Sequence, residues 1–139
     1  MAAIVSATAP ASENIASTMS GGMAPKTSQA AQRVGGHHTE VLRTEYTNTE
    51  MWVVTQVGRI GAIVRASQLV GESGDKVIVC RTLFGKRDDD MHDLFARVVA
   101  EKIIGTTGKN LTLAFALKPE VDSEQLKSIV DLCCSVLLM

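Results

Sequence analysis

The chain has 139 residues, of which 45% are hydrophobic and 21% charged, and its formal net charge is −1. This length and composition are typical of one globular domain. The near-neutral charge argues against a general attraction to nucleic acid or to an anionic membrane, and no apolar run approaches the roughly 20 residues that span a bilayer. The three cysteines fit neither a disulfide framework nor a zinc site, which predicts a reducing compartment, the cytoplasm or the nucleus.

The first 37 residues are rich in Ala, Ser, Thr and Gly, and their apolar residues follow no period. Such a segment cannot bury enough surface to offset its ordering entropy, so we predict a disordered tail over residues 1–37. Residues 38–139 then form a single domain. At its start, residues 39–47 (TEVLRTEYT) combine β-formers with polar alternates and predict a strand partly open to water.

Residues 51–66 (MWVVTQVGRIGAIVRA) form the centre of the predicted domain. We interpret them as a hairpin of two apolar strands joined by a tight turn at Gly58 and Gly61. Neither strand alternates cleanly between apolar and polar residues, as a strand with one solvated face would. Both are therefore expected to be covered on two faces, with Trp52 and Val54 sharing one of them.

Two further strands and a helix are predicted after the central stretch. Residues 76–84 have an apolar centre, and in residues 110–117 large and small residues alternate, so both segments predict strands. The run of aspartates at 88–90 predicts the capped start of a helix with one apolar stripe, and Gly105 predicts its end. The same aspartates, with His92 beside them, could instead bind a divalent cation or serve an enzyme, although a helix start explains them more simply.

A second helix is predicted from Asp122 or Ser123, because Gln125 completes a pattern that resembles a capping box. Strands followed by helices predict an α+β fold, here an antiparallel sheet of five to six strands with two helices on one face. Two helices packed about 10 Å apart cover only that one face. The other face also carries apolar positions, so we predict that it is available for dimerisation with another polypeptide.

The sequence contains no convincing catalytic or ligand-binding constellation. No serine or cysteine has an evident histidine and carboxylate partner. Gly85 and Lys86 lack the remaining residues of a phosphate loop. The GxxG of residues 58–61 resembles the loop of nucleic-acid-binding KH domains, but here it joins strands rather than helices. We therefore expect no enzymatic activity, no cofactor and no metal.

The central stretch resembles a known family. Residues 53–56 (VVTQ), 58–61 (GRIG) and 63–64 (IV), with the preceding strand at 39–47, resemble proteasome assembly chaperone 3. The most specific part is the pattern VTQ-x-G-[RK]-x-G. The aliphatic strand at 111–117 and the last helix follow in the same order, so the resemblance spans nearly the whole predicted domain.

The resemblance implies a small α+β chaperone that pairs through its sheet, either with a proteasome assembly chaperone 4-like subunit or as a homodimer. It also implies that the pair holds a proteasome α-type subunit, the α5 subunit in particular, while the 20S α-ring assembles, and that it leaves as β subunits are added. The alternative is a profilin-like or roadblock-like adaptor for a trafficking or motor complex. Strand order discriminates the two, because roadblock domains begin with two strands and then a helix.

The predicted partner interface follows the central stretch and its charged neighbours. Arginines next to apolar strands could orient a partner. The predicted interface residues are Trp52, Val54, Gln56, Gly58, Arg59, Gly61, Arg65 and Arg81. If Val54 faces the partner, Val54→Asp should weaken pairing more than folding.

Overall fold

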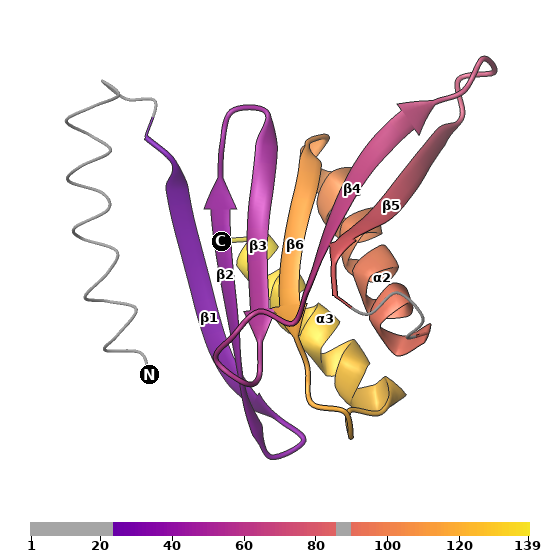
Figure 1. Cartoon of the computed structure of the whole chain (residues 1–139). Helices are drawn as coiled ribbons and strands as arrows, with labels where there is room; N and C mark the ends of the chain where they lie inside the picture. Colours follow the sequence, from indigo (N-terminus) through magenta and orange to yellow (C-terminus); the bar gives the residue numbers. More distant parts are fainter. Residues whose placement is uncertain (1–23, 86–89) are drawn as a thin grey trace.

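The computed structural model describes residues 24–85 and 90–139. These residues form an α+β fold of six strands and two helices, and both helices lie on the same side of one sheet (Figure 1). The elements are β1 (Lys26–Val34), β2 (His37–Glu45), β3 (Thr49–Thr55), β4 (Ala62–Val70), β5 (Lys76–Phe84), α2 (Asp90–Thr107), β6 (Asn110–Ala116) and α3 (Ser123–Leu137).

The strands lie in the order β1-β2-β3-β6-β4-β5. Neighbouring strands are antiparallel except for β3 and β6, which run parallel. The predicted α+β sheet of five to six strands with two helices on one face is thus confirmed. The parallel pair arises because the chain passes through α2 before it returns as β6.

The predicted hairpin at residues 51–66 is wrong. Its two strands exist as β3 and β4, but β6 lies between them in the sheet. Leu113 of β6 pairs with Trp52 on one side and with Val64 on the other. Sequence proximity favours a local hairpin, whereas here β3 and β4 each pair with β6, a central strand from much later in the chain.

The predicted disordered tail is wrong for its last part, because β1 pairs with β2 along its whole length. Gly35 and Gly36 join the two strands with φ values of 58° and 81°, a backbone conformation that glycine adopts without strain. The ordering of β1 comes from its backbone hydrogen bonds to β2 and from Val34, which is buried in the core. Residues 1–23 of the predicted tail lie outside the described residues.

The core fills the space between the sheet and the helices. Its largest fully buried side chains include Trp52, Phe95, Ile103, Leu113, Phe115 and Ile129. The predicted capping box of α3 is present. The Asp122 carboxylate accepts a hydrogen bond from the backbone N–H of Gln125 at 2.8 Å, and the Gln125 side chain accepts one from the backbone N–H of Asp122 at 3.4 Å.

Helix α2 differs from its predicted bounds at both ends. It begins at Asp90, while the predicted cap residues Asp88 and Asp89 lie outside the described residues. It does not stop at Gly105 but continues to the residue before Gly108, whose φ of 70° ends the helix. A glycine does end the helix, as predicted, but it is Gly108 rather than Gly105.

Candidate functional site

The side of the sheet that faces away from α2 and α3, the open face, carries exposed apolar side chains. Successive side chains of a strand point to opposite sides, so Trp52 and Val54 face the helices while Met51 and Val53 belong to the open face. Trp52 and Val54 are fully buried, whereas Met51 is 37% exposed. The structure thus has the apolar face, beyond the reach of the two helices, that the sequence predicts.

The open face changes character from one edge of the sheet to the other. On β3, β6, β4 and β5 it is mostly apolar, and this part is called the apolar half. Its apolar members are Met51, Val53, Ile63, Leu69, Val77, Val79, Phe84, Ala114 and Ala116. On β1 and β2 polar residues prevail, such as Gln29, Arg33, Glu40 and Thr44.

Strands β4 and β5 form an arm that extends beyond the rest of the sheet. Strand β4 pairs with β6 only as far as Ala66 and then continues to Val70 with β5 alone (Figure 1). Leu69 and Val77 form a cross-strand pair on this arm and are 58% and 54% exposed. A two-stranded segment is marginally stable alone, so exposed apolar pairs at this position favour contact with another molecule.

The loop between β3 and β4 carries the most specific part of the family resemblance, and its residues maintain the shape of the loop. The hydroxyl of Thr55 accepts hydrogen bonds from the backbone N–H groups of Val57 at 3.2 Å and Gly58 at 3.0 Å. The same hydroxyl donates to the carbonyl of Arg59 at 3.0 Å. Gly58 has a φ of 73°, which favours glycine over residues with a Cβ.

Gln56 joins this loop to the end of β6. Its Nε2 donates to the hydroxyl of Thr39 at 3.1 Å, and its Oε1 accepts from the backbone N–H of Lys118 at 2.8 Å. Gly61 packs so closely on Ala116 that an added Cβ would lie 3.3 Å from the Ala116 Cβ. The pattern VTQ-x-G-R-x-G therefore specifies a loop that crosses the end of β6, which is why its Gln and Gly are needed.

The predicted interface residues fall into two groups. Trp52, Val54 and Gln56 are buried, so the prediction that they contact a partner is wrong: alternation along β3 turns them away from the open face. Met51 and Val53, which the prediction omitted, belong to the open face instead. The other predicted residues are exposed, namely Gly58, Arg59, Gly61, Arg65 and Arg81.

Comparison with known proteins agrees with the resemblance found in the sequence. The family model of proteasome assembly chaperone 3 matches residues 52–135. The chain belongs to this family. It shares its fold with a chain of a crystal structure described as a novel chaperone complex for yeast 20S proteasome assembly, with a TM-score of 0.67 and 14% identity over 81% of this chain and 98% of that chain. None of the curated proteins that were compared matches it.

A buried polar network lies on the helix side of the sheet in this proteasome assembly chaperone 3 family member. Nε and Nη2 of Arg43 donate to the two carboxylate oxygens of Glu50, each at 2.8 Å, and Nε1 of Trp52 donates to the same carboxylate at 2.9 Å. Arg43 also donates to the carbonyl of Leu137 in the last turn of α3 at 3.2 Å. The network therefore connects β2, β3 and α3.

The charges of this network stabilise one another. Burial alone would raise the pKa of Glu50, but hydrogen bonds from Arg43 and Trp52, with the positive charges of Arg43 and Lys109, hold that pKa below its ordinary value. The hydrogen bond to Glu50 raises the pKa of Arg43. Both groups stay charged, and Oε1 of Glu45 lies 3.3 Å from Nη2 of Arg43 as a second acidic partner, so the network stabilises the contact of β2, β3 and α3.

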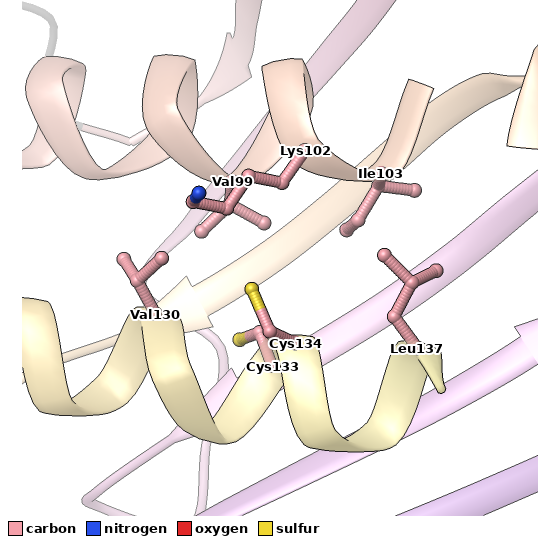
Figure 2. Close-up of a pocket in the computed structure, with 7 residues that line it drawn as sticks. All are labelled: Val99, Lys102, Ile103, Val130, Cys133, Cys134 and Leu137. Carbon is pink, nitrogen blue, oxygen red and sulfur yellow. The ribbon is translucent and has the colours of Figure 1, made fainter. Parts of the chain in front are cut away.

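The groove between α2 and α3 is a helix contact rather than a ligand site (Figure 2). Its lining residues are Val99, Lys102, Ile103, Val130, Cys133, Cys134 and Leu137. These side chains leave no room for a water-sized molecule. Burial raises the pKa of Cys133 to about 12, so this thiol stays protonated at neutral pH.

The described residues contain no group of three or more His, Cys, Asp or Glu side chains that could hold a metal ion. The ring of His92 lies edge-on against that of Phe115, with 5.3 Å between the ring centroids. Asp88 and Asp89, the other members of the alternative cation site, are outside the described residues. In the part of the chain that the structure describes, no helix is both long and apolar enough to cross a membrane.

Proposed function

We propose that this chaperone of proteasome assembly acts as one half of a dimer. Its open face packs against the sheet of a proteasome assembly chaperone 4-like subunit or of a second copy. The pair then holds an α-type subunit, the α5 subunit in particular, while the 20S α-ring assembles. The observation that carries the proposal is the set of exposed apolar side chains on a sheet face opposite both helices: Met51 on β3, Leu69 on β4, and Val77, Val79 and Phe84 on β5.

The size of the open face suits such a pairing. Six strands spaced about 4.8 Å apart give a sheet roughly 29 Å wide. Strands of seven to nine residues are roughly 23–30 Å long at about 3.3 Å per residue. The resulting area, roughly 670–870 Å², includes the roughly 800 Å² that each partner contributes to a stable interface.

A chaperone of this kind needs differential affinity rather than a catalytic group. It must bind an assembly intermediate well and lose that contact when later subunits cover the same surface. The exposed loop at Gly58 and Arg59 and the β4–β5 arm provide such surfaces at the ends of the sheet. We accordingly propose no enzymatic activity for the chain and place it in the cytoplasm or the nucleus.

The adaptor alternative has less support. A roadblock domain begins with two strands and then a helix, whereas five strands precede α2 in the described residues. The match to the proteasome assembly chaperone 3 family points in the same direction.

The decisive experiment measures pairing in a variant that keeps the fold. Met51→Asp places a carboxylate in the middle of the open face at a position that is 37% exposed, so the monomer should tolerate it. We expect it to abolish binding to a recombinant proteasome assembly chaperone 4-type subunit and to abolish self-association in sedimentation. Capture of the α5 subunit by the pair should fall in parallel.

The matched control is Leu94→Asp, which introduces the same charge at an exposed apolar residue of α2. This variant should pair normally because α2 covers the opposite side of the sheet. Circular dichroism melts establish that both variants are folded. Normal pairing by a folded Met51→Asp variant would contradict the proposed function.

A further inference from the structure

Two arginines face each other on the apolar half of the open face. Arg65 of β4 and Arg81 of β5 are directly opposed in the antiparallel register, and both are exposed. Residues opposed in this way have Cβ atoms about 5 Å apart, and like charges there repel and destabilise the sheet. The isolated chain therefore loses stability by carrying this pair.

The neighbouring residues do little to relieve the repulsion. Nη1 of Arg65 donates a hydrogen bond to the hydroxyl of Thr112 at 3.0 Å, but that hydroxyl carries no charge. Within the described residues, Arg81 has no ion pair with an acidic side chain. Two residues away along the same strands, the side chains on this face include Ile63, Ser67 and Val79, none of which carries a charge.

The covered side of the same sheet shows how the chain treats an arginine that is removed from water. Arg43 is buried there, and both oxygens of Glu50 accept hydrogen bonds from it. When a partner covers the open face, Arg65 and Arg81 lose water as well, and a buried charge without a counter-charge is strongly destabilising. The covering surface must therefore supply an anion at this point.

We propose that Arg65 and Arg81 form a receptor for an aspartate or glutamate side chain of a heterotypic partner, and that they disfavour pairing between two identical copies. The inference rests on the proposed function, since it concerns the same sheet face. One carboxylate between two guanidinium groups accepts charge-assisted hydrogen bonds from both and cancels their repulsion. The arginine pair then contributes to the choice of partner as well as to affinity.

A second copy of the chain meets this requirement poorly. On the open face of the described strands, the acidic side chain is Glu40 of β2, which already contacts Nε2 of His38 at 3.2 Å. Glu40 lies in the polar half, separated from the arginines by β3 and β6. A different polypeptide with a carboxylate over β4 and β5 fits the charge pattern better.

The test uses the full chain and a recombinant proteasome assembly chaperone 4-type subunit from the same organism as the probe, with affinity measured by calorimetry at low and high salt. Arg65→Gln/Arg81→Gln removes both charges and keeps much of each side chain. We expect affinity at low salt to fall at least about tenfold and the salt dependence to flatten, because the variant has lost its charged contact. Self-association of the variant should increase relative to that of the unmodified chain.

The control variant, Arg97→Gln/Lys127→Gln, removes the same number of positive charges from exposed positions of α2 and α3. It should bind the probe with unchanged affinity and unchanged salt dependence. A general effect of net charge would instead weaken binding in both double variants.

A second measurement separates a role in recognition from a role in folding. Arg81→Gln relieves the like-charge contact, so the melting temperature of the isolated chain should rise by roughly 1–5 °C while its affinity for the probe falls. A residue that served only the fold would change stability and pairing in the same direction.

Two results would overturn the inference: unchanged affinity of Arg65→Gln/Arg81→Gln for the probe, or self-association that the double variant weakens. The second result would make another copy of the chain the occupant. Met51→Asp tells this failure from that of the proposed function. If Met51→Asp abolishes pairing while the arginine variant pairs normally, only the carboxylate receptor is wrong, whereas normal pairing in both means that the open face is not the interface.

Discussion

Strand β3 has two sides that follow opposite rules. On the helix side, Trp52 and Val54 are fully buried. Glu50, near the start of the strand, is buried on the same side, and its carboxylate accepts hydrogen bonds from Arg43 and Trp52. On the open side, Met51 is exposed, and level with it across the sheet lie Arg65 of β4 and Arg81 of β5. These two arginines have no acidic partner among the residues that the structure describes.

The difference between the two sides indicates what each contributes. The helix side satisfies its polar groups and covers its apolar groups, as a stable core requires. The open side leaves apolar side chains exposed and gives its two arginines no acidic partner within the described residues, as expected for the surface that we propose binds another polypeptide. Substitutions on the two sides should consequently separate folding from pairing.

The largest effect is expected for Val54→Asp. Val54 has no exposed surface, so the substitution buries an unpaired carboxylate and removes core contacts. We expect a loss of about 4 kcal/mol or more in the free energy of unfolding, enough to unfold much of the chain. Urea titration followed by circular dichroism measures this loss.

Val53→Asp is the matched comparison, because it makes the same change on the adjacent residue of the same strand. Val53 lies on the open side and is half-buried between its lateral neighbours, so the variant should remain folded and lose pairing instead. Equal loss of folding in both variants would remove the distinction between the two sides. Equal loss of pairing in folded proteins would remove it as well.

The next largest effect concerns the network on the helix side. Glu50→Gln removes the carboxylate that both Nε and Nη2 of Arg43 bind and leaves this buried guanidinium with Glu45 alone, at 3.3 Å, which should cost about 2 kcal/mol of stability. Replacing both partners, as in Arg43→Met/Glu50→Leu, should restore much of it, since well-packed apolar residues need no counter-charge. A double-mutant cycle in urea titrations measures the coupling.

The same carboxylate predicts the direction of a pH effect. Burial alone would raise the pKa of Glu50, but hydrogen bonds and nearby cations hold it below its ordinary value in the folded chain. Its contribution to stability is therefore complete above the unfolded-state pKa of about 4.3 and is lost as the pH falls through the lower folded-state pKa. In Glu50→Gln, this part of the acid sensitivity should be absent, whereas a variant on the open side should retain it.

Much of the fold could be predicted from the sequence because its signals are local. Strand propensity in residues 39–47 and 76–84, the alternation in 110–117 and the capping box at Asp122 and Gln125 all correspond to observed elements. Pairing between strands is not local. No sequence spacing indicates that β6 separates β3 from β4, and β1 has too few apolar residues to be detected apart from its pairing with β2.

The sides of β3 could be grouped from the sequence but not assigned. Alternation places Trp52 with Val54 and Met51 with Val53, yet it does not say which set meets the helices. Glu50 shares the side of Trp52, and a charged residue there argues against burial until its partner Arg43 is known. Two features of Trp52 indicate the helix side in retrospect: its size, and the need of its indole N–H for a hydrogen-bond acceptor when it is buried.

The smallest predicted effect concerns the loop that joins β3 to β4 across the end of β6. Gly58 has a φ of 73° and open space around it, so Gly58→Ala tests backbone conformation alone. We expect a loss of about 1 kcal/mol in the free energy of unfolding, because a Cβ disfavours this conformation. Gly105→Ala in α2 should have the opposite sign: its surroundings are also open, its φ is not positive, and alanine stabilises a helix interior by up to about 1 kcal/mol relative to glycine. Urea titration measures both changes. If the two variants changed the free energy of unfolding in the same direction, the positive φ of Gly58 would not be the reason for glycine at that position.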